Sequence, residues 1–388
     1  MNAIVSRRDV LAGAAAASFT FLPSRVLGRG GAVPPSEKLN VACCGIGTRG
    51  SFDLREIANL GHNVVAICDV DWRPLKGRQY PTPVEMLPAF PKAKRYDDWR
   101  ILLHEEEKNI DAVLVATPDH THAVISLTAM KMGKHVYCEK PLAHSVQEVR
   151  AMIAAEKKYK VTTQTGCQGH SSEDCRLLVQ WVKDGAIGDV REVHIFQNTG
   201  TNQGRRVDYP GLPKLVGEDH AVPEELKWDL WLGPAPFRKF NEAYLPSAWR
   251  IWRDFGDGVI GDYCCHSFDP VFWALDLGLP EAVQSEADAP FDPETNKHTW
   301  PNSGNVRWDF PARAKKPPVA VTWHYGPDSG HIPLPKGWKS TDILPPAGGG
   351  ILFGTQGAMV FGPIYASLPL SASTQGYKPV TWGTPTSS

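Results

Sequence analysis

The chain has 388 residues, a formal net charge of −1 and a sequence pI of about 6.9. This charge balance gives no basis for binding nucleic acid or an anionic membrane surface, and the length suffices for two domains. No apolar run reaches the roughly 20 residues of a membrane-spanning helix, so no span is predicted. The eight cysteines form no C-x-x-C pair and do not indicate a zinc site or a disulfide framework.

The N-terminus has the pattern of an export signal. Arg7 and Arg8 precede a mildly apolar, alanine-rich stretch at residues 11–22. Twin arginines before such a stretch are typical of bacterial twin-arginine signals. We therefore expect residues 1–36 to be a signal peptide and linker and the twin-arginine (Tat) export machinery to be a partner. The mature protein is expected to be periplasmic or exported.

The pattern of residues 39–71 predicts a strand, a glycine-rich turn, a helix and a second strand that ends in an acidic residue. An apolar run at 39–44 leads into GIGTRG at 45–50, and a second apolar run at 64–68 ends in Asp69. In this context G-x-G-x-x-G predicts a dinucleotide-binding turn, with a diphosphate at the helix N-terminus. Asp69 falls where a carboxylate accepts from a ribose hydroxyl and repels a 2′-phosphate, so NAD is favoured over NADP. The predicted cofactor-binding residues of this unit are Gly45, Ile46, Gly47, Thr48, Arg49, Gly50 and Asp69.

Strands and helices continue to alternate as far as residue 165. The expected elements are strands at 110–116, 135–138 and 161–164, and helices at 123–132 and 146–159, the latter capped by Ser145. Such alternation is typical of a parallel, doubly wound α/β sheet, which binds ligands at the carboxyl ends of its strands. Thr117, Glu139 and Lys140 follow such ends. Residues 37–165 are therefore predicted to form an NAD-binding Rossmann domain.

The pattern changes after residue 166. Residues 200–250 are rich in Pro, Gly and Trp and show little regular periodicity. The expected elements are helices at 177–184 and 261–275 and strands at 189–198, 305–309, 319–325 and 351–353. We expect residues 166–365 to form a second, α+β domain with an open, mostly antiparallel sheet. Residues 366–388 are rich in Ser, Thr and Pro and are expected to be a disordered tail.

Four ordered motifs resemble those of one enzyme family. They are GIGTRG at 45–50, ATPDHTHA at 116–123, EKPLA at 139–143 and GDYCCHSFD at 261–269. Together they are similar to the Gfo/Idh/MocA oxidoreductases over residues 39 to about 361. The resemblance implies a Rossmann domain that binds NAD and a C-terminal α/β domain whose open sheet often mediates homo-oligomers. At these motifs and nearby, the implied cofactor-binding residues are Thr117, Pro118, His122, Glu139, Lys140 and Gln168.

The resemblance also implies catalytic roles for Lys140, Asp262 and His266. The lysine would lie near the nicotinamide and the substrate hydroxyl, where desolvation beside a cationic ring would lower its pKa and let it pass a proton. Asp262 and His266 are spaced i, i+4, which places them on one face of a helix. His266 would be the general base for the hydroxyl proton, and Asp262 would hold a substrate hydroxyl or orient His266.

Five residues are weaker candidates. Gln168 could contact the nicotinamide amide or ribose, and His122 could instead brace its own helix. His170 could contact substrate or share a divalent ion with His266, but no ligand spacing requires this, and no metal is predicted. Trp249 and Arg250 resemble a Trp-Arg element on the family's cofactor side. Arg250 could bind phosphate or substrate or pair with a local acid, and Trp249 could stack on a sugar or fill the core.

Three functions remain open. The first is NAD-dependent oxidation of a small-molecule carbohydrate, a sugar or glycoside, with hydride transfer between a ring carbon and NAD. The second is a redox-neutral glycoside hydrolase or lyase, with oxidation, elimination, hydration and reduction around a tightly bound NAD. Export favours it, because a periplasm offers no ready pool of NAD. The third is a non-catalytic or truncated paralogue, because chains of this type usually continue with another helical segment. Turnover without added NAD separates the first two.

Overall fold

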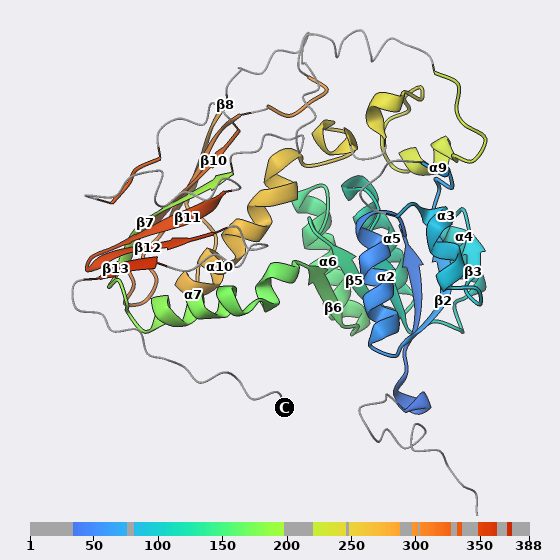
Figure 1. Ribbon diagram of the computed structural model, residues 1–388, viewed down its shortest axis with the longest axis horizontal. Coiled ribbons are helices and arrows are strands. Elements are labelled where there is room, and N and C mark those ends of the chain that lie inside the picture. The colour runs from blue at the N-terminus through green and yellow to red at the C-terminus, as the bar shows by residue number, and fades with distance from the viewer. Residues whose placement is uncertain are drawn as a thin grey trace, which may run out of the picture.

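The computed structural model describes residues 34–75, 81–197, 220–245, 248–287, 297–301, 303–326, 332–335, 348–362 and 371–374. Figure 1 shows two domains side by side, each built on its own sheet. Helix α10 and the segment before it lie between the two sheets (Figure 1). The carboxyl ends of the first sheet therefore meet residues of the second domain.

The first sheet has six parallel strands in the order β3-β2-β1-β4-β5-β6. This is the strand order of a Rossmann fold, in which the chain reverses direction across the sheet between β1 and β4. The strands are β1 (Asn40–Cys44), β2 (Asn63–Cys68), β3 (Lys94–Tyr96), β4 (Ala112–Val115), β5 (His135–Glu139) and β6 (Thr163–Gly166). They are apolar over most of their length because helices cover both faces.

The helices of this domain begin where the sequence supplies a start signal. Ser145 caps α6 by accepting from the backbone N–H of Glu148, as predicted. Helix α5 begins at Asp119, directly after Pro118, and thus four residues before the apolar periodicity used to predict it. The helices are α2 (Arg49–Asn59), α3 (Pro83–Met86), α4 (Trp99–Glu105), α5 (Asp119–Lys131) and α6 (Val146–Tyr159). The 3₁₀ turns are η2 (Pro35–Glu37), η3 (Leu87–Ala89) and η4 (Gln168–Ser171).

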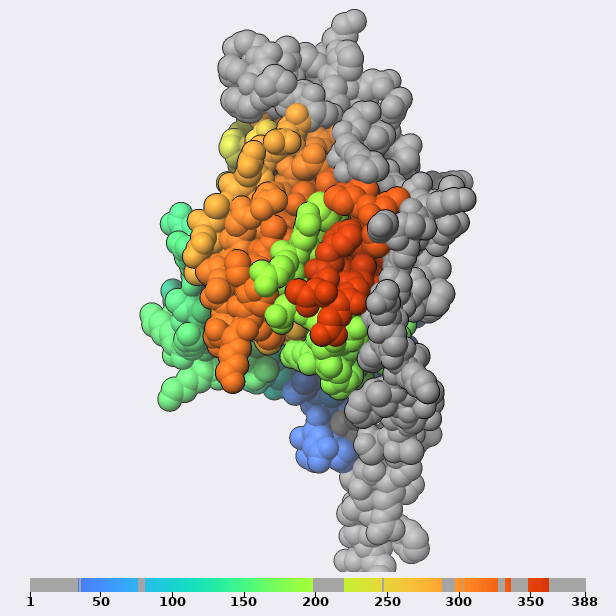
Figure 2. Space-filling view, turned by 90° about the vertical axis from the view of Figure 1, so that its left-hand side faces the viewer, coloured from blue at the N-terminus to red at the C-terminus, as the bar shows by residue number. Residues whose placement is uncertain are grey.

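The second sheet has seven strands in the order β13-β12-β11-β7-β10-β9-β8, and only β7 and β10 pair in parallel. Helices α7 (Glu173–Lys183) and α10 (Cys265–Leu275) pack their apolar sides on one face. Figure 2 looks onto the opposite face, where strands coloured green, orange and red lie at the surface. The strands are β7 (Val190–Gln197), β8 (Ala282–Ala287), β9 (Gly304–Phe310), β10 (Val319–Tyr325), β11 (Gly349–Gly354), β12 (Gly357–Phe361) and β13 (Ser371–Thr374).

A tryptophan-rich segment forms a third, smaller core. It contains α9 (Trp228–Leu232) and the 3₁₀ turns η6 (Glu242–Tyr244) and η7 (Ala248–Ile251). Its aromatic rings are buried against one another. His120 of α5 joins this core to the first domain, because its two ring nitrogens lie 3.2 and 3.1 Å from the carbonyl oxygens of Phe255 and Trp231. The described part of the segment for which we expected little regular structure, residues 220–245 and 248–250, therefore belongs to a packed unit.

The structure confirms the predicted fold class, a parallel Rossmann sheet followed by a mostly antiparallel open sheet. Two details were wrong. The predicted helix at 261–275 begins as a π-helical turn, Ile260–Cys264, before α10. Within the tail expected to be disordered, Ser371–Thr374 pair with β12 as a strand. The predicted export signal lies outside the described residues, and no helix of the described part is long and apolar enough to cross a membrane.

Candidate active site

The glycine loop after β1 is shaped by close backbone contacts. Gly45 has φ +79°, and a Cβ there would lie 2.6 Å from the carbonyl oxygen of Ala116. A Cβ on Gly50 would lie 1.9 Å from the carbonyl oxygen of Gly45, so only glycine lets α2 start this close to β1. Gly47 has only the ring of Pro83 near its Cβ position. The loop thus fits the predicted cradle for a diphosphate at the N-terminus of α2.

Asp69, at the end of β2, ties this loop to the sheet. Its Oδ2 accepts from the backbone N–H of Ile46 at 2.9 Å, and its Oδ1 accepts from the N–H groups of Val70 and Asp71. Burial raises the pKa of Asp69 to about 6, although the three hydrogen bonds from backbone N–H groups act to lower it. Because a carboxylate offers about four acceptor positions, one remains for a ribose hydroxyl. The residue fits its predicted role and also fixes the loop.

Arg49 contacts a residue that the sequence analysis missed. Its Nη2 donates to Asp53 Oδ1 at 2.6 Å, and its Nε donates to Glu139 Oε1 at 3.1 Å. Asp53 lies one helical turn after Arg49 on α2, and this i, i+4 spacing of opposite charges was the signal that could have identified it. The predicted cofactor residues Arg49 and Glu139 are thus brought together.

His122 is buried and holds two strand ends together. Its Nδ1 and Nε2 each lie 2.7 Å from a backbone carbonyl oxygen, those of Pro141 and Thr117. Because both partners only accept, both ring nitrogens must donate, and the ring is an imidazolium. Burial opposes this charge, but Cys138, Asp119 and the Pro141 carbonyl raise the pKa of His122 to about 10. With 1% exposure, His122 braces the site from below, and its contact with the cofactor stays a prediction.

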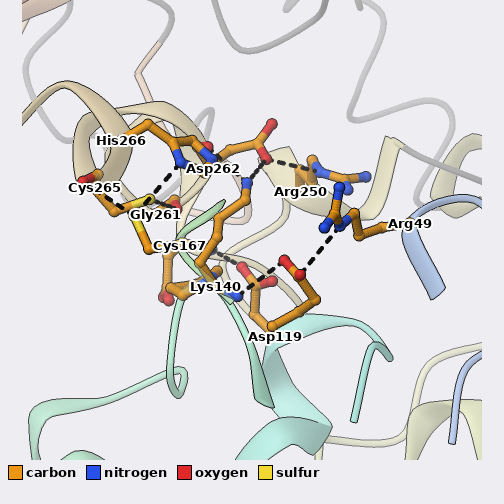
Figure 3. Close-up of polar contacts among 12 residues, drawn as sticks. Arg49, Asp119, Lys140, Cys167, Arg250, Gly261, Asp262, Cys265 and His266 are labelled. Carbon is orange, nitrogen blue, oxygen red and sulfur yellow. Dashed lines mark hydrogen bonds and ion pairs between the residues drawn. The ribbon is translucent and has the colours of Figure 1, made fainter. Parts of the chain in front are cut away.

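Lys140, from the end of β5, reaches the π-helical turn of the second domain. Its Nζ donates to the carboxylate Oδ1 of Asp262 at 2.6 Å and to the backbone carbonyl of the same residue at 2.7 Å. Arg250 Nε lies 3.2 Å from the same Oδ1, and its guanidinium stands 4.3 Å from the centre of the Trp249 ring. Figure 3 shows the two cations converging on Asp262. The structure therefore joins residues 122 positions apart in the chain.

This ion pair corrects one expectation. Burial lowers the pKa of Lys140, but the Asp262 carboxylate outweighs burial, and the net pKa is raised rather than lowered. Burial opposes ionisation of Asp262 too, but Arg250 and Lys140 hold its pKa well below the ordinary value. Both groups are therefore charged at neutral pH, and the ammonium of Lys140 is a hydrogen-bond donor.

His266 lies beside this pair, in the first turn of α10, and is 3% exposed. Its Nδ1 is 3.7 Å from the Sγ of Cys167 (Figure 3). Burial and the positive charge of Lys140 lower the pKa of His266 to about 3, so the ring is neutral at pH 7. A neutral imidazole has one unprotonated ring nitrogen that can accept, and the role of His266 as general base stays a prediction. The π-helical turn before it is of a kind common at functional sites.

The weaker candidates have other surroundings. His170 pairs with Asp269 at 2.8 Å and stacks on Trp273, so it does not converge with His266. Trp249 is buried in the aromatic core and packs against the guanidinium of Arg250, and its contact with a sugar stays a prediction. Gln168 begins η4, directly after the end of β6, near the strand ends that bear the site. The described residues contain no group of three or more side chains arranged to hold a metal ion.

Two family models cover most of the described chain. Residues 39–167 match the model of an oxidoreductase family with an NAD-binding Rossmann fold, and residues 172–304 match the model of its C-terminal alpha/beta domain. The chain belongs to the Gfo/Idh/MocA oxidoreductase family. Its first domain is therefore an NAD-binding Rossmann domain, as the glycine loop and Asp69 predicted.

Curated relatives match over part of their length. Inositol 2-dehydrogenase of Salmonella typhimurium is 31% identical over 159 residues, which is 40% of this chain and 45% of that protein. The 2,7-anhydro-N-acetylneuraminate hydratase of Escherichia coli is 31% identical over 110 residues, 28% of this chain and 30% of that protein. The chain thus spans less than half the length of these relatives.

Solved structures align over more of the chain than these curated relatives do. The WlbA dehydrogenase from Bordetella pertussis, in complex with NADH and UDP-GlcNAcA, has a TM-score of 0.58 at 16% identity and covers 88% of this chain and 84% of its own. The aldose-aldose oxidoreductase from Caulobacter crescentus has a TM-score of 0.55 at 19% identity, covering 88% and 85%. At such identities the likeness shows the fold alone.

Proposed function

We propose that this Gfo/Idh/MocA protein is an enzyme that oxidises a hydroxyl group on a ring carbon of a sugar or glycoside with NAD. The observation that carries the proposal is the meeting of Lys140, Asp262 and His266 at the carboxyl ends of the NAD-binding sheet. Sugar-related names among its relatives, such as inositol 2-dehydrogenase, support the substrate class.

Each residue has a task that its charge state permits. The chemistry that a bound NAD⁺ would supply is a hydride acceptor for the substrate carbon. The neutral ring of His266 accepts the hydroxyl proton, because a base must be unprotonated at the start. The Lys140 ammonium donates a hydrogen bond to the substrate oxygen and stabilises its developing negative charge. Asp262 holds that ammonium in place, and Arg250 in turn holds the Asp262 carboxylate.

The test is a screen of sugars and glycosides with added NAD⁺, monitored by the absorbance of NADH. We expect activity on at least one sugar and a loss of about 100-fold or more in Lys140→Met and His266→Gln, the usual size of a general acid–base effect. Asp269→Asn is the matched control, because Asp269 lies on the same helix but faces His170. Equal loss in all three variants would contradict the assignment.

A second candidate is redox-neutral cleavage or hydration of a glycoside around a retained NAD. It is supported by the relative named as a hydratase, since that name describes a reaction without net oxidation. Protein purified without added cofactor should then contain nearly one NAD(H) per chain and cleave glycosides with no NAD added. A cofactor-free preparation that needs added NAD⁺ contradicts this candidate and favours the dehydrogenase.

Export and assembly complete the proposal. Arg7 and Arg8 support delivery through the Tat machinery to the periplasm or beyond, which cell fractionation of the native and an Arg7→Lys, Arg8→Lys form tests. The broad strand surface in Figure 2 supports a homo-oligomer formed through the second sheet. Light scattering of the purified protein tests this.

A further inference from the structure

A cluster of buried charges beside the glycine loop takes no part in the catalysis proposed above. Arg49 is the first residue of α2, and Asp53 on the same helix and Glu139 at the end of β5 both accept from its guanidinium, at 2.6 and 3.1 Å. The Arg49 side chain is 35% exposed, whereas the two carboxyl groups beneath it are 7% and 4% exposed. We call Asp53 and Glu139 the carboxyl pair.

The carboxyl pair carries more negative charge than its surroundings compensate. One guanidinium faces two carboxylates, and the Oδ2 of Asp53 is buried with no hydrogen-bond partner among the described residues. A proton on the pair would remove one negative charge and would turn an acceptor without a partner into a donor. Two carboxyl groups that share one buried site characteristically retain such a proton.

The proton exchanges in the physiological range. Burial and the neighbouring Glu139 raise the pKa of Asp53 to about 7, and Arg49 acts in the opposite direction. If Arg49 moves, or if another anion pairs with its guanidinium, the pKa of the carboxyl pair therefore changes.

The other titratable groups that face this cluster do not change charge near neutral pH. Burial raises the pKa of Tyr137 on β5 to about 12 and that of Cys43 on β1 well above its ordinary value. Cys167, which faces the pair from beyond β6, has a pKa raised by burial to about 11. His266, which faces Arg49 from α10, has a pKa lowered by burial to about 3. Among the groups that face this cluster, the carboxyl pair is therefore the one that titrates between about pH 6 and pH 9. Asp69 and Asp257, whose pKa values burial raises to about 6 and about 8, are not in contact with the pair, and a proton that they exchange would persist in a variant of the pair.

We propose that the carboxyl pair takes up one proton from solvent when the dinucleotide binds and releases it when the dinucleotide leaves. A diphosphate at the N-terminus of α2 adds negative charge beside Arg49 and competes with the carboxyl pair for its guanidinium. The pair then holds its proton more tightly, and cofactor affinity becomes linked to pH. This inference rests on the NAD-binding domain and does not depend on the proposed sugar substrate.

Calorimetric titration of the protein with NADH, in buffers of different ionisation enthalpy, counts the protons taken up. NADH is the probe because its nicotinamide ring is uncharged. We expect uptake to approach one proton per NADH near pH 8 and to be small near pH 6, where the pair is already protonated. Because binding takes up a proton, the affinity for NADH should decrease as pH rises, by up to about tenfold from pH 7 to pH 8.

Three variants make the test specific. Asp53→Asn and Glu139→Gln each remove one acid of the pair, and each should abolish the uptake and flatten the affinity against pH. Glu56→Gln is the matched control, because Glu56 is exposed on the same helix and should retain the full uptake. The inference would be overturned if native protein bound NADH near pH 8 without taking up a proton. It would also be overturned if the Asp53→Asn variant took up as many protons as native protein. Either result would leave the NAD-binding assignment intact. Native protein that binds no NADH would overturn the cofactor assignment with it.

Discussion

Replacing Asp262 by Asn should destabilise the protein far more than a surface change does. Asp262 Oδ1 receives Lys140 at 2.6 Å and Arg250 at 3.2 Å, and the side chains of the three residues are 13%, 14% and 26% exposed. Asparagine keeps the shape but leaves two poorly hydrated cations without a counter-charge. Removing one partner of a buried pair costs about 3–5 kcal/mol, and we expect about 2–4 kcal/mol here because the site is partly open to water.

The assay is thermal unfolding of the native protein and the variant, followed by intrinsic tryptophan fluorescence. For a domain of 150–250 residues, about 1 kcal/mol shifts Tm by roughly 2–4 °C, so a loss of about 2–4 kcal/mol should lower Tm by about 4–16 °C. Asp269→Asn is the control: it removes a carboxylate from the same helix whose partner, His170, is 48% exposed, and should change Tm by at most about 3 °C. Equal shifts for the two variants would refute the argument.

The same pair predicts how this difference depends on pH. Arg250 and Lys140 depress the pKa of Asp262 in the folded protein, so the unfolded chain binds the proton first as pH falls. The stabilisation is therefore fully present above the ordinary aspartate pKa of 3.8 and declines as pH falls below it. The Tm difference between native protein and Asp262→Asn should be constant from about pH 5 to pH 8 and shrink toward pH 3.

Three further predictions concern the fold beneath the site. Gly50→Ala should abolish NADH binding, measured by fluorescence, because its Cβ would overlap a backbone carbonyl oxygen at 1.9 Å; Gly278→Ala, with nothing within 4 Å, should bind normally. His122, with a pKa of about 10, should show two protonated ring nitrogens by ¹⁵N NMR at pH 8, and a neutral ring there would contradict the double-donor geometry. His266, with a pKa of about 3, should remain neutral at pH 5 in the same spectra. Because the ring protonates near pH 6.5 in the unfolded chain, its burial should reduce the stability of the folded protein as pH falls below that value.

The first domain was largely predictable because its signals are local. The glycine loop, the apolar strands and Ser145 each specify their own conformation within a few residues. Strand β12 and the short β13 were not predicted, since neither has a pattern long enough to distinguish it from loop. The π-helical turn was also missed. The spacing of apolar residues predicts a helix, but it does not distinguish a single π-helical turn from an α-helical one.

The sequence predicted which residues belong to the candidate site, but not how they contact one another or which of them are charged. Lys140 could be placed at a strand end, but its contact with Asp262 joins two domains, and no local pattern encodes a contact over 122 positions. Only the resemblance to a family linked the two motifs. The charge states were not predictable, because they depend on burial and on neighbours such as Arg250, which arrive from other elements.

Those charge states assign opposite tasks to the two principal residues. Asp262 keeps Lys140 protonated, and the charge of Lys140, together with burial, keeps His266 neutral. One environment thus supplies a hydrogen-bond donor and a proton acceptor side by side, which is the usual way a site separates acid from base. In the proposed reaction Lys140 is therefore the hydrogen-bond donor while Asp262 is ionised, and His266 is the remaining acceptor for the hydroxyl proton. Asp262 would then act on that reaction through the charge it imposes on Lys140.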